Sequence, residues 1–339
     1  MTAGEVFGAY DFGLSEEQEA RARRLHAESI IIDTLFQGPC GARSFTPEIV
    51  EGLQREYEGH RDPRRGLMSA VKLPVRLAVR GQFPDFESCW RASGITAGNR
   101  QTGGMSLEEA FEGFALNQAQ FDRLPWLIKA TSAADFRRAK AEGKRAGFVS
   151  TQNTVDIGLH LDRLDQYYDL GMRMIQLTYN SVNFVGGGCT DRVDCGVTDY
   201  GVKFIRRMNE LGIIVDTGHC GRRTTLDACA LSDVPVVASH TSAAGVHPHD
   251  RAKSDEELRA IAATGGYIGV YCVGMFLTAE PDATIEHFLD HVDYIARLVG
   301  PRHVGVGSDW PMQAPEWGVE RLAEWSKEIG FREEHGVTR

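Results

Sequence analysis

Three short apolar runs each end on a side chain that can bind a metal or carry a proton. The runs are IIVDTGH at 213–219, VVASH at 236–240 and HVGVGSD at 303–309, so the residues are His219, His240 and Asp309. Neutral imidazole and carboxylate suit zinc or a similar borderline metal. Such a metal lowers the pKa of a bound water and supplies a hydroxide nucleophile. A single histidine after a strand is more often a satisfied polar group, but three such ends predict a metal or catalytic site.

The three runs belong to a series of apolar, β-branched stretches that alternates with helical patterns. The predicted strands are 29–35, 94–98, 147–151, 174–180, 213–219, 236–241, 267–272 and 303–309. The runs are continuous, which is typical of a parallel sheet covered by helices. The best helical patterns are 106–124, 198–212 and 254–266, each preceded by or beginning with a capping residue, and Ser106 with Glu109 has the spacing of a capping box.

Eight strands in this alternation favour an α/β fold of the (β/α)8 TIM barrel type over an open doubly wound sheet. Active sites of such barrels lie at the C-terminal ends of the strands, so we expect His219, His240 and Asp309 to converge there. We expect one domain over residues 1–339. Residues 36–93 carry HRDPRRG and several prolines, and we interpret them as an insertion after the first strand that covers the barrel mouth.

Composition narrows the class of protein. The chain has 339 residues, 42% of them hydrophobic, and a formal net charge of −10, which argues against nucleic acid or an anionic membrane as partner. The first 28 residues contain no apolar signal sequence, and the run at 267–277 is too short to span a bilayer. We therefore expect a cytoplasmic protein. Cys189 and Cys195 could bridge or bind a metal, but reduced thiols are favoured in such a compartment.

Several motifs from 170 to 310 resemble the membrane dipeptidase (renal dipeptidase) family of metallopeptidases, within the amidohydrolase-like barrels. They are LGMRMIQLTYN, GVTDYGVKFIRRMNELGIIVDTGH, VVASHTSAAGVHPHDRAKSDEELRAIAATGGYIGV and HVGVGSDW. The resemblance implies two zinc ions side by side, with His219 and His240 as ligands of one. It implies that Asp309 orients the water and shuttles its proton, and that Arg251 grips the substrate's carboxylate, a task that suits a guanidinium fork.

The sequence departs from the family pattern at four functional positions. Strand one of the family reads Asp-Gly-His-Asn-Asp, whereas this chain has Asp33, Thr34, Leu35, Phe36 and Gln37. The family's bridging Glu after strand three is replaced by Gln152, and its substrate-facing His after strand four by Tyr179. Without these carboxylates two adjacent dications would repel strongly. We therefore expect at most one zinc per chain, held by His219, His240 and Asp309, with Leu35 and Phe36 placing apolar bulk in the other site.

The leading hypothesis is a metal-dependent hydrolase that cleaves the amide bond of a dipeptide or small amino-acid derivative by metal-bound hydroxide. Asp309 is the catalytic base and then the acid. The expected substrate contacts are Arg251, Tyr179, Gln152 and Asn180. Two alternatives stay open: a non-hydrolytic barrel that binds a small carboxylate or methylated amino acid, and a lyase or isomerase that uses Asp309. The expected partner is a small molecule with a free carboxylate, and a homodimer is left open.

Some further residues can be interpreted as either functional or structural. Asp33 could orient a neighbour or cap a turn. Cys272, at the end of strand seven, is more simply a buried thiol, and His247 with His249 are more simply surface histidines than ligands. The glycine run at 185–189 could form an anion nest or a flexible loop. Cys220 should point away from the mouth, because adjacent strand residues face opposite sides.

Overall fold

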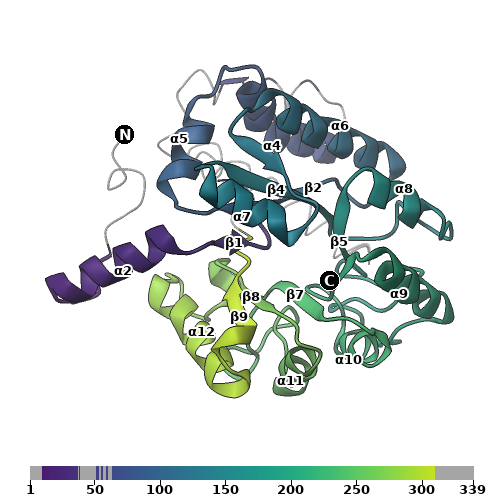
Figure 1. The fold of residues 1–339 in the computed structure, drawn as a ribbon. Helices are drawn as coiled ribbons and strands as arrows, with labels where there is room; N and C mark the ends of the chain where they lie inside the picture. Colours follow the sequence, from purple (N-terminus) through teal and green to yellow (C-terminus); the bar gives the residue numbers. More distant parts are fainter. Residues whose placement is uncertain are drawn as a thin grey trace.

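The computed structural model describes residues 10–36, 38, 51–52, 55, 59 and 63–309. A ring of parallel strands follows the chain order β1-β2-β4-β5-β6-β7-β8-β9, with helices outside it (Figure 1). The strands are β1 (Ile32–Asp33), β2 (Ala97–Gln101), β3 (Leu127–Lys129), β4 (Arg145–Thr151), β5 (Met172–Gln176), β6 (Ile214–Asp216), β7 (Val236–Thr241), β8 (Ile268–Val270) and β9 (Val304–Val306). All paired neighbours are parallel.

The last strand returns to the first and closes the ring. The Thr34 N–H donates to the Val306 carbonyl at 3.2 Å, and the Asp309 N–H donates to the Leu35 carbonyl at 2.9 Å. The prediction of a (β/α)8 barrel is therefore confirmed. The short strand β3, which the sequence reasoning missed, pairs with the start of β4 beside the ring.

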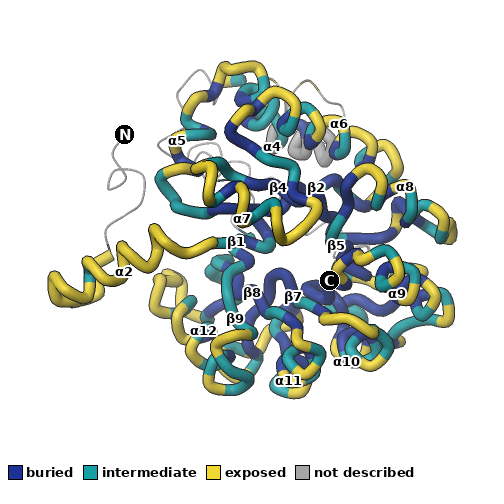
Figure 2. The backbone as a smooth tube through the Cα atoms, viewed as in Figure 1, coloured by how far each residue is buried: buried dark blue, intermediate teal, exposed yellow. Residues whose placement is uncertain are grey.

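Helices cover the outside of the barrel; the strands are largely buried, and the helices carry the exposed residues on their outer sides (Figure 2). The helices are α2 (Glu16–Glu28), α4 (Pro63–Val79), α5 (Asp85–Ala92), α6 (Leu107–Arg123), α7 (Ala133–Ala141), α8 (Arg163–Asp169), α9 (Asp199–Leu211), α10 (Arg222–Leu231), α11 (Asp255–Ala263) and α12 (Ile285–Val299), with short 3₁₀ turns at Gly274–Phe276 and Pro301–His303.

The caps that the sequence predicted are formed. The side chains of Ser106, Thr198 and Ser254 each accept a hydrogen bond from an N–H of the first helical turn. Gly212 ends α9 in the left-handed conformation at φ 75°, which glycine adopts without steric cost. These local signals explain why the three predicted helices are found almost at the predicted residues.

Strand boundaries differ from the prediction in a way that matters for the site. β2 begins at Ala97 rather than at 94, because Gly94 has a φ of 70° and turns the chain. β6 ends at Asp216 and β9 at Val306, so His219 and Asp309 each lie three residues beyond their strand. Of the three predicted site residues, only His240 lies within its strand.

Apolar clusters join the described strands to the helices around them. The largest cluster packs Phe204 and Met208 of α9 against Ile175 of β5 and Val215 of β6. A second, aromatic cluster includes Phe36, Phe86, Trp90 and Trp126, with the rings of Phe36 and Trp90 4.7 Å apart. Burial of such side chains stabilises the fold by about 1.5–3 kcal/mol each.

The described part of the predicted insertion contains α4 and α5. α5 supplies Phe86 and Trp90 to the aromatic cluster, and α4 contacts α6. Much of 36–62 lies outside the described residues, so its covering of the mouth stays a prediction.

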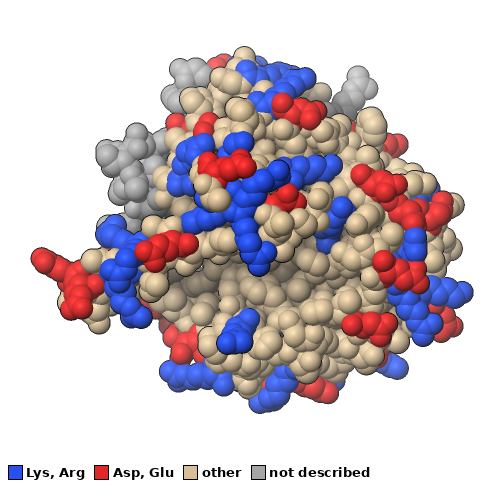
Figure 3. All heavy atoms as spheres, viewed as in Figure 1, with Lys and Arg blue, Asp and Glu red and all other residues tan. Residues whose placement is uncertain are grey.

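The molecular surface carries mixed charge. Basic and acidic side chains are interspersed over the face shown in Figure 3, including the region of α7 where a basic stretch alternates with acids. Helix α2 has no buried residue and extends away from the barrel (Figures 1 and 2). No helix among the described residues is long and apolar enough to cross a bilayer.

Candidate functional site

The structure brings the two predicted histidines into contact. His219 lies in the turn after β6 and His240 in β7, and their Nε2 atoms are 2.8 Å apart. The carboxylate of Asp309 approaches them, with its Oδ2 4.0 Å from His240 Nε2. Asp309 has a φ of 47°, an unusual value for a residue other than glycine. Three strand ends therefore converge on one point, as the barrel interpretation predicted.

The other ring nitrogen of each imidazole, Nδ1, has a hydrogen-bond partner of its own. His219 Nδ1 lies 2.6 Å from the side-chain oxygen of Asn180, and His240 Nδ1 lies 2.8 Å from the hydroxyl of Ser239. The Ser239 hydroxyl also donates to Asp216 Oδ2 at 2.5 Å. Such outer partners orient the ring and fix which nitrogen carries the proton.

Burial sets the charge state of the pair. The pKa of both His219 and His240 is well below its ordinary value, first because burial disfavours the charged form and then because Arg251 is nearby. Burial also raises the pKa of Asp216, which hydrogen bonds from Ser239 and the Gly218 N–H oppose. At neutral pH the two imidazoles are therefore uncharged, which is the form that binds metals.

Arg251 is a buried cation close to the pair, with only 4% of its surface exposed. Its guanidinium donates through Nη1 to the Gly218 carbonyl and through Nη2, at 3.5 Å, to the His240 carbonyl. The ring of Tyr271 lies 5.7 Å from it. Within the described residues no ion pair includes Arg251. A buried charge without a counter-ion is costly, so this position favours an anionic ligand.

Tyr179, a predicted substrate contact, lies against one of the histidines. The ring of Tyr179 stacks on His219 with centroids 4.1 Å apart and planes 21° apart. Tyr179 is 40% exposed. The structure thus places Tyr179 and Asn180, which are adjacent in the chain, on two sides of the same imidazole.

The two histidines supply two nitrogen donors that suit one metal ion. Two uncharged imidazoles direct their Nε2 atoms to one place, with a carboxylate 4.0 Å from one of them. Among the residues that the structure describes, no group of three or more His, Cys, Asp or Glu is arranged to hold a metal. The ligand set of His219, His240 and Asp309 therefore stays a prediction. The short distance between the two histidine nitrogens supports the histidine part of it.

The end of β1 does not offer metal ligands among its described residues. Leu35 is 1% exposed, and Gln37 lies outside the described residues. Phe36 packs into the aromatic cluster beside α5, so its ring fills the space between strand and helix. This differs from the expectation that Phe36 adds bulk to the metal site. The reason is that Trp90 and Trp126 offer an apolar contact that the sequence reasoning did not pair with it.

Gln152 and Asp33 have defined local roles. Gln152 Nε2 donates to Gln101 Oε1 at 2.6 Å, and the Gln152 carbonyl accepts from Gln176. Asp33 Oδ1 accepts from the N–H groups of Leu35, at 3.1 Å, and Ser308, at 2.8 Å. Asp33 thus caps a turn and joins the end of β1 to the segment that carries Asp309.

Several other candidates have structural partners. Cys220 lies in the largest apolar cluster, away from the mouth, as expected, and burial raises its pKa to about 11. His249 Nδ1 accepts from the Arg251 N–H at 3.1 Å. Cys189 and Cys195 are free thiols. The N–H groups of the glycines at 186–188 donate to side chains of Asn183, Thr224 and Asp191, so the glycine run is not an open anion nest.

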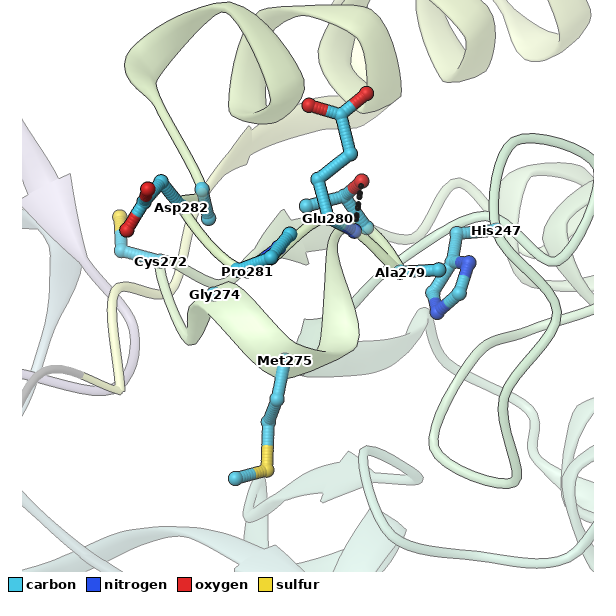
Figure 4. Close-up of a pocket in the computed structure, with 10 residues that line it drawn as sticks. His247, Cys272, Gly274, Met275, Ala279, Glu280, Pro281 and Asp282 are labelled. Carbon is cyan, nitrogen blue, oxygen red and sulfur yellow. Dashed lines mark hydrogen bonds between the residues drawn. The ribbon is translucent and has the colours of Figure 1, made fainter.

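A cavity of about 670 Å³ lies between the loop after β8 and the loop after β7. It is lined in part by His247, Cys272, Glu280 and Asp282, and in the view of Figure 4 His247 lies at the end opposite Cys272 and Asp282. The Cys272 N–H donates to the Ser308 carbonyl, so the cavity adjoins the segment of Asp309. Burial, with the nearby acids, raises the pKa of Cys272 to about 12, so its thiol stays protonated.

Sequence reasoning missed three buried polar residues around the histidines. Asp216 and Ser239 form the chain of contacts behind His240. Gln176 donates to two carbonyls, and no described residue donates to its Oε1, which faces Gly218. The available signal was a carboxylate in the apolar run IIVD and a serine directly before His240.

Fold and site together define a closed, parallel (β/α)8 barrel with two neutral histidines, a carboxylate and a buried arginine at the C-terminal ends of its strands. Residues 19–327 match the family model of the membrane dipeptidases, peptidase family M19. The chain therefore belongs to the membrane dipeptidase family, as its motifs predicted.

Individual relatives agree with this assignment. An uncharacterised dipeptidase of Schizosaccharomyces pombe is 35% identical over 194 residues, which are 54% of this chain and 46% of that protein, so the match spans about half of the relative. A solved amidohydrolase from Pseudomonas aeruginosa is 28% identical, with a TM-score of 0.67 over 85% of this chain and 76% of that chain. The probable dipeptidase PvdM from Pseudomonas aeruginosa, at 20% identity, shares the fold, with a TM-score of 0.68 over 92% and 94% of the two chains.

Proposed function

We propose that the protein is a metal-dependent dipeptidase that hydrolyses the amide bond of a dipeptide or small amino-acid derivative with a free carboxylate. The observation that carries this proposal is the placement of two neutral imidazoles beside Asp309 and a buried guanidinium without a carboxylate partner among the described residues. Membership of a metallopeptidase family supports the reaction class. The proposed location is the cytoplasm.

The residue roles follow from this placement. His219, His240 and Asp309 would hold zinc, which when bound would polarise the scissile carbonyl and lower the pKa of a water molecule. Asp309 accepts the proton of the attacking water and returns it to the leaving amine. Arg251 binds the substrate's carboxylate, and Tyr179, Gln152 and Asn180 contact the rest of the substrate.

The proposal includes at most one zinc per chain. Leu35 supplies no ligand at the end of β1, and the Gln152 amide is paired with Gln101. Elemental analysis after expression in zinc-supplemented medium should give no more than one ion per chain, and His219→Ala or His240→Ala should remove it. Two tightly bound ions in the wild-type protein would contradict the single-metal site.

The proposed role of Arg251 in binding the substrate's carboxylate can be tested with a variant and a matched control. Arg251→Ala should weaken binding of dipeptides and small acids by about 2–4 kcal/mol, the range for removing one partner of a buried charge pair. Arg259→Ala is the control, because Arg259 is exposed on α11 and pairs with Asp255. Calorimetry with a series of small acids measures both. Equal affinity of wild type and Arg251→Ala would make the arginine structural.

One observation favours a second function, the binding of a methylated amino acid without hydrolysis. Tyr179 stacks on His219 and is 40% exposed, and an aromatic ring at this place is a group that attracts a quaternary ammonium ion. A screen of dipeptides, N-methylated amino acids and betaines, with both hydrolysis and thermal shift measured, separates the two. Stabilisation by betaines without cleavage of any dipeptide would favour the binding function over the peptidase.

A further inference from the structure

The carboxylate of Asp216 is the start of a chain of contacts that ends at the histidine pair. Asp216 is buried at the end of β6, and its Oδ1 accepts from the N–H groups of Gly218, at 3.0 Å, and Ser239, at 2.8 Å. Its Oδ2 accepts from the Ser239 hydroxyl at 2.5 Å. Burial raises the pKa of this carboxyl, whereas the three donors and the nearby Arg251 oppose that shift and favour the ionised form, which can only accept.

This carboxylate fixes the direction of the next hydrogen bond. The Ser239 hydroxyl has one hydrogen and gives it to Asp216, so its oxygen can only accept from His240 Nδ1, 2.8 Å away. His240 therefore carries its single proton on Nδ1. The Nε2 of a neutral imidazole in this tautomer is a bare lone pair.

Asn180 has the same effect on the other histidine. Its side-chain oxygen lies 2.6 Å from His219 Nδ1 and also accepts from the Cys189 thiol at 3.7 Å. An amide oxygen can only accept, so His219 also carries its proton on Nδ1. The assignment of oxygen and nitrogen in the amide is consistent with both donors.

The two tautomers conflict with each other unless a cation is present. His219 Nε2 and His240 Nε2 are 2.8 Å apart, yet neither has a hydrogen to share. Two bare lone pairs at this distance repel, whereas a metal ion that binds both nitrogens turns the same geometry into an attractive one.

We propose that Asp216, Ser239 and Asn180 are positioning residues that lock both imidazoles as Nδ1–H tautomers and so prepare a two-nitrogen metal site before metal arrives. This inference deepens the proposed function, because it concerns the ligands of the same metal. It concerns residues outside the predicted ligand set, and it can be measured without any substrate.

The first test is nitrogen NMR of the metal-free, full-length protein, with His219→Gln and His240→Gln used to assign the signals. Chemical shifts of imidazole nitrogens distinguish a protonated from a bare nitrogen. We expect bare Nε2 in both residues. A proton on His240 Nε2, which would donate to His219 Nε2, overturns the proposal, because the Ser239 hydroxyl must then donate to His240.

The second test reverses the direction of the hydrogen bonds from Asp216 through Ser239 to His240. In Asp216→Asn the amide can donate to Ser239, which turns the Ser239 hydroxyl toward His240 Nδ1 and moves the imidazole proton to Nε2. We expect zinc affinity, measured by competition with a chelator, to fall about 10- to 100-fold, the range for outer partners of metal ligands. Asn180→Asp keeps an acceptor at His219 and should retain affinity, whereas Asn180→Leu should lose it.

Ser242, which directly follows β7, provides a matched control. Ser242 is also fully buried, but its hydroxyl pairs with Tyr271 at 2.8 Å rather than with a histidine. Ser242→Ala should leave zinc affinity unchanged, and circular dichroism with thermal melting confirms that each variant is folded. An Asp216→Asn protein that binds zinc as tightly as wild type overturns the proposal, as does a wild-type protein that binds no zinc.

The two proposals can fail separately. If the tautomers and zinc affinities behave as expected and no dipeptide is cleaved, the peptidase function fails while the positioning role stands. If dipeptides are cleaved and His240 carries its proton on Nε2, the positioning role fails while the peptidase function stands.

Discussion

At the ends of β6 and β7 the side chains that meet are imidazoles with polar partners, whereas the end of β1 packs against aromatic side chains of α5. We call the first region, with His219, His240 and Asp216, the histidine side. We call the second, with Leu35, Phe36 and Trp90, the aromatic side. On the histidine side hydrogen bonds direct the rings. On the aromatic side Phe36 contacts Trp90 at 4.7 Å, and the buried Arg100 lies over both rings.

The difference shows how one barrel can separate stability from chemistry. The aromatic side removes apolar area from water and needs no ligand to be stable. The histidine side holds two uncharged imidazoles and the buried Arg251, which forms no ion pair with a described residue, so a ligand or metal that binds there stabilises it. Substitutions on the aromatic side should therefore change the free energy of unfolding most, and those on the histidine side should change binding most.

The largest expected effect on stability comes from Phe36→Ala. The ring is 4% exposed, and its removal should lower the free energy of unfolding by about 3–5 kcal/mol because it leaves a cavity beside Trp90. Phe184→Ala is the matched control, since that ring is 53% exposed and should cost about 0.5 kcal/mol or less. Urea unfolding measures both. Similar losses for the two variants would remove the distinction between the regions.

The next effect concerns Asp156, a buried carboxyl after β4 that differs from Asp216 in its donors. Tyr167 donates to its Oδ2 at 2.7 Å, but no described residue donates to its Oδ1, and burial raises its pKa from 3.8 to about 6. A raised carboxyl pKa stabilises the protein at low pH, and this contribution is lost as pH rises from about 4 through 6.

Asp156→Asn should therefore be more stable than wild type above pH 6, by about 3 kcal/mol for a shift of about two pKa units. Below pH 4 the two proteins should have similar stability. Unfolding free energies measured from pH 3 to pH 8 test this. A difference that is the same at every pH would mean that the carboxyl is not the cause.

A smaller effect is expected at Asp33, which links the aromatic side to Asp309. Asp33→Ala leaves the buried Leu35 N–H and the half-buried Ser308 N–H without their acceptor and should cost about 2 kcal/mol. Asp33→Asn keeps an oxygen acceptor and should cost about 1 kcal/mol or less. Thermal unfolding of the two variants gives the comparison. Equal losses would show that the negative charge, rather than the acceptor, holds the turn.

The smallest effect on stability is expected at Tyr179, on the histidine side. Tyr179→Ala removes a partly exposed ring that stacks on His219 and should cost about 0.5–1 kcal/mol. Its effect on ligand affinity should exceed that of Tyr179→Phe, which keeps the stacked face. Parallel thermal melts and calorimetry measure the two quantities. A loss of several kcal/mol in stability would place Tyr179 with the structural residues of the aromatic side.

The sequence by itself determined the barrel, most of its strands and the helix ends. Periodicity and caps are local, so Ser106, Thr198 and Ser254 could be assigned without knowing what packs on their helices. The convergence of His219, His240 and Asp309 also followed, because parallel strands of a barrel end on one face. The family motifs carried the rest of that prediction, and residues 19–327 match the family.

Only the tertiary structure decided which atoms meet. Phe36 and Trp90 are far apart in the chain, and their contact depends on how α5 packs on β1 and β2. The Ser239 hydroxyl beside His240 reaches a carboxylate of the neighbouring strand β6, because β6 and β7 pair with Asp216 opposite Val237. Local sequence sets which element forms, but these side-chain contacts join residues of different elements, so they depend on how the strands and helices pack on one another.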